Sequence, residues 1–234
     1  MKIFASISPS DLPAPDLHAL MLSIVIPRPI GLISTISLDG LPNLAPFSYF
    51  QAVSAVPPLL LFCPNRNRFG RVKHSLINAR DQREFVACMV TEEMAEAVNY
   101  ASGEFPDGVN EFEEAGFTTL ASELVKPFRV AESPIQMECR VREVLEFSDQ
   151  PLGGSVVVGE ILLIHIREDI LVSVNSPQIS NFKYQISNDY RPISRLGGVA
   201  YGLLRQTFDM PRPKMTEDGK VVVGSHKVTR KSSL

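Results

Sequence analysis

From Pro29 onward, turn-forming residues divide the chain into short apolar and β-branched runs, and this feature constrains the fold most. Residues 30–37 are the first run, which ends at Asp39-Gly40, a pair that favours a tight hairpin because it readily adopts positive φ. Residues 43–54 are the returning strand. Repetition of this pattern along the chain predicts an all-β barrel or sandwich.

Further strands alternate with two short helices. The continuously apolar residues 59–63 predict a strand covered on both faces, and residues 84–90 predict another buried strand. Between them, apolar residues at helical spacing predict a helix over residues 72–80. A second helix is expected after Thr91, whose side chain can cap it, with an apolar face along residues 94–101.

The second half of the chain begins with residues 103–135, where glycine, proline and acidic clusters predict a long excursion with little regular structure. Such length is typical of a lid or a subunit contact. Residues 136–147 predict a half-buried strand that pairs with residues 154–166. Apolar residues on one face alternate with charged residues on the other, the apolar set being Met137, Cys139 and Val141 and the charged set Glu138, Arg140 and Arg142.

One domain is expected over residues 1–205, with its core at about 20–205, followed by a C-terminal arm or tail over residues 206–234. The formal charge of −3 gives no electrostatic reason to expect nucleic acid or an anionic membrane as a partner. No apolar run is long enough for a membrane span, so a cytoplasmic protein is expected. The three cysteines lie in apolar runs without a CxxC pair, which favours buried thiols over disulfides or a metal site.

The familiar nucleotide-binding motifs and the motifs of catalytic triads and zinc sites are all missing from the sequence. Neither GxGxxG nor GxxxxGK[ST] is present, and GxSxG and HExxH are equally absent. His165, inside an apolar strand, is expected to be a hydrogen-bonded core residue rather than a proton donor. An enzyme of this sequence would therefore depend on a cofactor.

Polar clusters nevertheless interrupt the apolar pattern at defined places. Arg28 begins and Ser34 and Thr35 end the first strand, which suits a phosphate, although an ordinary strand is the alternative. The segment Ala45-Pro46-Phe47-Ser48 contains a proline that would interrupt a ladder and free backbone groups for a ligand, or mark a plain edge strand.

Two more clusters follow along the chain. Lys73, His74 and Ser75 stand at the start of the predicted helix, where unpaired N–H groups and the helix dipole collect anions. A solvated basic face is the alternative. Arg195 and Tyr201 belong to a loop near the end of the core, and their motif has low specificity.

In this order the clusters resemble the flavin reductase-like family of FMN-binding split barrels, over about residues 20–205. The resemblance implies a mainly β split barrel with a few short helices, and FMN held non-covalently at the interface of a homodimer. It is carried by the segments PRPIGLISTISLDGLPNLAPFSYFQAVSAVPPLLLF, KHSLINARDQREFV, GVNEFEEAGF, SPIQMECRV and RLGGVAY.

The resemblance also implies roles for the clustered residues in cofactor binding. Ser34 and Thr35 would approach the phosphate or ribityl chain, with Arg28 at the start of the same strand, and Ala45 to Ser48, including Pro46 and Phe47, would line the ring. Lys73 and Ser75 would complete the phosphate site, and Arg195 would lie with Tyr201 near the cofactor or across the dimer. His74 departs from the family, because its position is often acidic there.

The implied activity is hydride transfer from NADH or NADPH to FMN, followed by delivery of electrons to a small-molecule substrate or acceptor. Such a reaction needs the cofactor to be positioned but demands no side-chain base. Two alternatives remain open: a flavin-dependent oxygenase, and a non-catalytic flavin carrier or electron-transfer protein.

Overall fold

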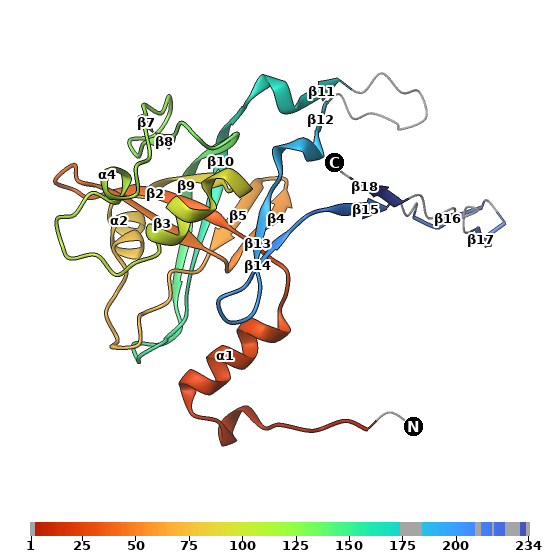
Figure 1. Cartoon of the computed structure of the whole chain (residues 1–234), viewed down its shortest axis with the longest axis horizontal. Coiled ribbons are helices and arrows are strands. Elements are labelled where there is room, and N and C mark those ends of the chain that lie inside the picture. The colour runs from red at the N-terminus through yellow and green to blue at the C-terminus, as the bar shows by residue number, and fades with distance from the viewer. Residues whose placement is uncertain (1–2, 174–183, 209–211, 217, 223–229, 233–234) are drawn as a thin grey trace.

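The computed structural model describes residues 3–173, 184–208, 212–216, 218–222 and 230–232 (Figure 1). Its centre is a seven-stranded antiparallel sheet with the strand order β3-β2-β6-β9-β10-β5-β4. This architecture confirms the mainly β fold expected from the sequence. The strands are β2 (Gly31–Ile36), β3 (Pro42–Phe47), β4 (Phe50–Ala55), β5 (Pro58–Phe62), β6 (Glu84–Met89), β9 (Ile135–Glu146) and β10 (Ser155–Ile166).

The predicted single strand over residues 43–54 is in fact two strands. β3 pairs with β2, whereas β4 pairs with β5 at the opposite edge of the sheet. Only Ser48 and Tyr49 connect the two strands, so Phe47 and Phe50 lie at most about 11 Å apart. The sheet must therefore curl until its two edges meet, which produces a barrel that is split between β3 and β4.

Aromatic side chains and one helix fill the barrel. The ring centroids of Phe47 and Phe62 lie 5.2 Å apart, and those of Phe62 and Phe85 lie 5.1 Å apart. Gly159 makes room for Phe85, because a Cβ at this glycine would lie 2.4 Å from the ring. Helix α2 (His74–Gln82) contributes the fully buried Leu76 to this interior.

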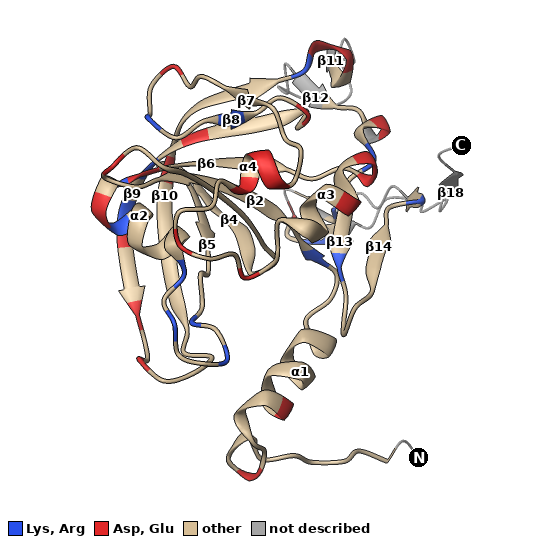
Figure 2. Cartoon of the chain, turned by 60° about the vertical axis from the view of Figure 1, so that its left-hand side comes forward, with Lys and Arg blue, Asp and Glu red and all other residues tan. Residues whose placement is uncertain are grey.

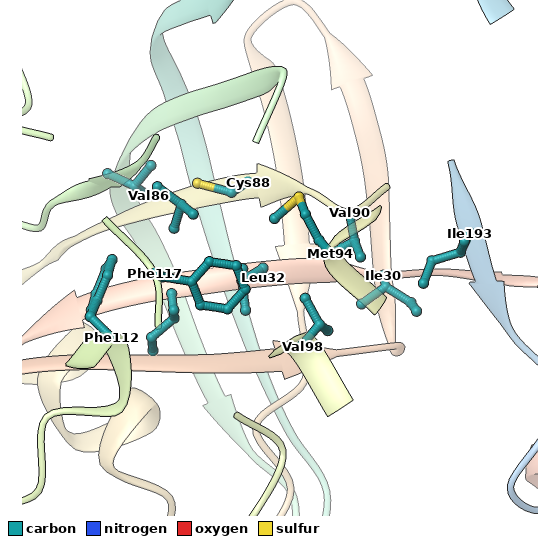
Figure 3. Close-up of a cluster of buried hydrophobic side chains, with 12 residues drawn as sticks. Ile30, Leu32, Val86, Cys88, Val90, Met94, Val98, Phe112, Phe117 and Ile193 are labelled. Atoms are coloured by element: carbon teal, nitrogen blue, oxygen red, sulfur yellow. The ribbon is translucent and has the colours of Figure 1, made fainter. Parts of the chain in front are cut away.

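A second apolar cluster lies on the outer face of the sheet (Figure 3). Leu32, Val86 and Cys88 of the sheet contact side chains from α3 (Ala95–Tyr100) and α4 (Glu111–Glu114). The helix predicted after Thr91 is present, but it begins as the 3₁₀ turn η2 (Glu92–Met94). The cap prediction is wrong, because the Thr91 side chain makes no capping hydrogen bond and its backbone bridges to Pro192 instead.

The excursion over residues 103–135 has little regular structure, as expected. Besides α4 it contains β7 (Thr119–Leu120) and β8 (Arg129–Val130). The predicted strand β9 is only partly as expected on its charged face. Arg140 and Arg142 are exposed, but Glu138 is fully buried. The excursion folds over this face, and the Glu138 carboxylate accepts hydrogen bonds from the amides of Glu123 and Leu124 at 2.9 and 2.6 Å.

A smaller sheet lies beside the barrel and supports the N-terminal helix. It consists of β1 (Arg28–Pro29), β13 (Ile193–Arg195) and β14 (Tyr201–Leu203). Helix α1 (Ala14–Ile24) projects away from the barrel (Figure 1), and none of its residues is buried. No helix among the described residues is long and apolar enough to cross a membrane.

Short elements complete the described chain. Within residues 206–234, β15 pairs with β18 and β16 pairs with β17. The arm or tail expected for this region stays a prediction. Cys88 and Cys139 are buried free thiols, as expected, and burial raises the pKa of Cys88 to about 12. Cys63 is only partly buried. The remaining elements are η1 (Pro9–Asp11), η3 (Glu168–Ile170), β11 (Leu171–Ser173), β12 (Tyr184–Ile186), η4 (Asn188–Tyr190), β15 (Gln206–Phe208), β16 (Lys214–Met215), β17 (Val221–Val222) and β18 (Arg230–Ser232).

Candidate functional site

A cavity of about 780 Å³ opens where edge strand β3, the start of α2 and the first part of the excursion meet. Its volume lies in the range of small-molecule and cofactor sites. The structure brings six of the predicted site residues together in its wall, which are Ala45, Pro46, Phe47, Lys73, His74 and Ser75.

The β3 wall is more regular than the sequence suggested. The ladder with β2 runs from Pro42 to Phe47 without a register shift, so Pro46 does not interrupt it. The physical reason is that β3 is an edge strand. The Leu44 amide points outward and donates to Glu111 Oε2 at 3.2 Å, and alternation places the nitrogen of Pro46 on the same outer side, where no ladder bond is lost.

The start of α2 offers donors to the cavity. Among the described residues, the amides of His74 and Ser75 have no hydrogen-bond partner, because they belong to the first helical turn. The positive end of the helix dipole lies at the same place, beside the Lys73 side chain. Unpaired amides, a dipole and a lysine together form a site that favours an anion.

Polar side chains fix this helix start against the sheet. The Asn43 amide nitrogen donates to Thr35 Oγ1 at 3.1 Å and to Ser75 Oγ at 3.0 Å. Asn78 donates to the same Thr35 oxygen at 3.2 Å. Thr35, predicted to contact a ligand, is thus buried beneath the cavity and holds Asn43, which lines it.

The opposite wall is the loop over residues 101–107, tied to the α2 side by two contacts. His74 Nε2 lies 2.9 Å from Asp107 Oδ1, and Asn67 Nδ2 donates to Glu104 Oε2 at 3.0 Å. The buried Glu111 closes the inner end of this wall, and burial raises the pKa of its carboxyl group. Basic residues before α2 thus face acidic residues of the excursion, whose helix α4 is red in Figure 2.

Four other predicted residues are absent from the wall of the cavity: Arg28, Ser34, Ser48 and Arg195. Arg28 is 3% exposed, and its guanidinium donates to the carbonyls of Leu22, Val25 and Leu196 and to Ser48 Oγ. It therefore anchors α1 rather than lining the cavity, and burial lowers its pKa. The Arg195 guanidinium stacks 4.5 Å from the ring centroid of Tyr201.

Ser34 lies within the outer apolar face of the sheet and is fully buried. Its hydroxyl has no hydrogen-bond partner in the described part of the chain. Ser34 and Thr35 point to opposite faces of β2, because side chains alternate along a strand. The two hydroxyls therefore cannot act on one ligand from the same side of the sheet.

Several wall residues were missed as individual ligand contacts. Asn43 and Glu111 stand inside the segments that carry the family resemblance, which is the signal that could have found them, whereas Arg71 belongs to the run of basic residues just before Lys73. The loop over residues 101–107 had only the length of the excursion as a signal, and Asn67, in the loop after β5, had none. In the described part of the chain, no group of three or more His, Cys, Asp or Glu residues is arranged to hold a metal ion.

Comparison with known proteins places this geometry in a family. An uncharacterized protein of Aquifex aeolicus is 40% identical over 185 residues, which cover 79% of this chain and 88% of that protein. Nitrilotriacetate monooxygenase component B from Bacillus cereus superposes with a TM-score of 0.80 at 28% identity, covering 90% of this chain and all of that one. The 2-nitrobenzoate 2-nitroreductase NbaA of Pseudomonas fluorescens gives a TM-score of 0.72 at 28% identity, over 91% and 97% of the two chains.

The model of the flavin reductase like domain matches residues 21–176. This range spans the split barrel together with α2, α3 and the excursion, and so includes every wall of the cavity. The chain belongs to the flavin reductase-like family of split-barrel proteins.

Proposed function

We propose that the chain binds FMN in the cavity between β3 and α2 and reduces it with NADH or NADPH. The observation that carries the proposal is that the amides of His74 and Ser75, next to Lys73 and across from edge strand β3, have no hydrogen-bond partner in the described part of the chain. The helix start suits the phosphate of FMN. The apolar surface of Ala45 and Phe47 suits its ring.

Bound FMN would supply the redox chemistry by accepting a hydride from the nicotinamide. The protein residues bind and orient. Lys73 and Ser75 hold the phosphate, Pro46 and its neighbours support one side of the ring, and the loop over residues 101–107 limits the access of water. The chemistry requires no acid or base at the site, which agrees with the absence of catalytic motifs from the sequence.

The final electron acceptor in this proposal is a small organic molecule. The likeness to the 2-nitrobenzoate 2-nitroreductase at 28% identity supports this choice over a protein acceptor. The oxygenase alternative would show product formation that depends on both oxygen and an organic substrate.

We also propose a homodimer as the working form. A helix of eleven residues is marginal in water when nothing covers it, and α1 has no buried residue. A second copy of the chain would cover it.

Anaerobic stopped-flow spectroscopy of the FMN-loaded protein tests the activity. The oxidised flavin band is expected to bleach with a rate that saturates in NADH or NADPH. If neither nicotinamide bleaches the holoprotein faster than it bleaches free FMN, the reductase assignment fails. A protein that binds FMN but shows no such reaction would be a carrier.

A further inference from the structure

A second cavity, of about 400 Å³, lies at the far end of the excursion and shares no lining residue with the first. It is formed where β8 and β10 end and β9 begins, and its polar lining is dominated by groups that donate hydrogen bonds. These groups belong to Arg129, Ser133, Gln136, His165 and Arg167.

Arg129 is held in place with donors to spare. Its Nε and Nη2 donate to the Ala121 carbonyl at 3.1 and 3.0 Å, and its Nη1 donates to Gln136 Oε1 at 3.2 Å. A guanidinium has five N–H groups, so two of those on Arg129 have no hydrogen-bond partner among the described residues. Gln136 is 6% exposed and its amide nitrogen bonds two backbone carbonyls, so it fixes the arginine from below.

The nearby carboxylates are already occupied. Glu138 is fully buried, and it accepts His165 Nε2 at 2.8 Å besides the two excursion amides. Its Oε1 also forms an ion pair with Arg129, 3.9 Å from Nε, so Arg129 is already partly neutralised. Asp169 accepts Arg167 Nε at 2.6 Å, which leaves the terminal nitrogens of Arg167 unpaired among the described residues. Glu123 Oε1 lies 3.8 Å from His165 Nδ1, beyond hydrogen-bond distance, and is mostly exposed.

We propose that this cavity is a second anion site that binds the phosphate group of a small molecule, separately from the flavin site. Two guanidinium groups line it, each with N–H groups that have no partner among the described residues, and arginine is the side chain best suited to a planar, paired contact with phosphate. The ligand would bridge the excursion, through Arg129, to the end of β10, through Arg167. Its binding would therefore restrict the motion of the excursion, whose first part lines the proposed flavin cavity.

Histidine NMR of the full-length protein tests the proposal, because His74 lines the first cavity and His165 the second. Inorganic phosphate is titrated at constant pH and ionic strength, and His165→Gln and His74→Gln assign the signals. A saturable shift of the His165 signal is expected. Arg167→Ala should weaken the apparent affinity about tenfold, as expected for loss of a charge-assisted hydrogen bond.

Arg142→Ala is the matched control, since Arg142 and Arg167 have similar side-chain exposures of 56% and 53% but Arg142 lies outside the cavity. This variant should keep the affinity of the native chain. The proposal is overturned if only His74 responds to phosphate, if chloride reproduces the shift, or if the two arginine variants lose equal affinity. None of these readings depends on flavin, so the proposed reductase activity stands or fails by itself.

Discussion

His74 Nε2 lies 2.9 Å from Asp107 Oδ1, and this contact joins the start of α2 to the loop that forms the opposite wall of the cavity. The pair lies at the mouth of the cavity, as shown by the exposure of the two side chains, which is 93% for Asp107 and 39% for His74. An exposed pair contributes little to global stability. Its effect should therefore fall on the opening of the loop over residues 101–107, which the contact joins to α2.

Asp107→Asn is expected to raise the rate of FMN dissociation several-fold while the unfolding free energy changes by less than about 1 kcal/mol. The carboxylate that contacts His74 is lost, whereas the size of the side chain is kept. Fluorescence recovery after dilution of the holoprotein measures the rate. Asp81→Asn, which removes a carboxylate that pairs with Arg80 outside the cavity, should leave dissociation unchanged.

Lys73→Ala and Ser75→Ala should each weaken FMN about tenfold to a hundredfold but riboflavin much less, because riboflavin has no phosphate. Fluorescence titration with the two ligands gives the comparison. Lys126→Ala is the control, since its ammonium group donates to Gln82 away from the cavity. Equal losses for FMN and riboflavin would place the phosphate elsewhere.

Arg28→Met should lower the unfolding free energy by about 3 kcal/mol, because carbonyl groups that the guanidinium satisfies would lose their donors. Urea denaturation measures this loss. Limited proteolysis should also cut near α1, whose C-terminal end loses its anchor. Arg142→Met, which removes the exposed ion pair with Glu160, should cost no more than about 1 kcal/mol.

Glu138 makes the folded state sensitive to acid. Burial opposes ionisation of its carboxyl group, but the amides of Glu123 and Leu124 and the contact with His165 outweigh it and lower the pKa below 4.5. A lowered folded pKa means that the stabilisation is present above the unfolded value and is lost as the pH falls through the folded one. Glu138→Gln should thus destabilise the protein at pH 7 by about 1–3 kcal/mol.

The difference between Glu138→Gln and the native chain should shrink below pH 4.5, where the native carboxylate takes up its proton. Urea denaturation at pH 7, 5 and 3.5 follows this change. A difference that stays constant over the series would show that the carboxylate charge contributes nothing and that only its shape matters.

Dimer formation is expected to depend on the exposed apolar face of α1. Met21 and Ile24 are 45% and 62% exposed. Met21→Glu and Ile24→Glu together should shift the sedimentation coefficient at micromolar concentration from that of a dimer to that of a monomer. A native chain that sediments as a monomer and still binds FMN fully would contradict the shared-interface proposal.

Local signals in the sequence predicted much of this structure. Gly40 adopts a φ of 85° in the β2–β3 hairpin, as its place after Asp39 indicated. Helical spacing of Leu76 and Ala79 predicted α2, and the residues at its start do line the cavity. These features depend on neighbours within a few residues, which sequence patterns report well.

Features that depend on distant pairing were not predictable in this way. The break at Ser48 and Tyr49 follows from which edge of the sheet each flanking strand joins, and no local pattern states that. The burial of Glu138 likewise depends on the excursion folding back to supply two amides. The Arg28 guanidinium is a group suited to phosphate, but it donates its hydrogen bonds to the carbonyls of three residues that are distant from the cavity.

The strand order also dictates how this protein can be made in the cell. β9 and β10 come late in the sequence, yet they lie between β6 and β5 in the middle of the sheet. Until residue 166 has left the ribosome, β5 and β6 each have one edge without a partner, and such open edges invite aggregation. The barrel can close only after synthesis has passed this hairpin, so β5 and β6 each keep one open edge while residues 90–166 are being made.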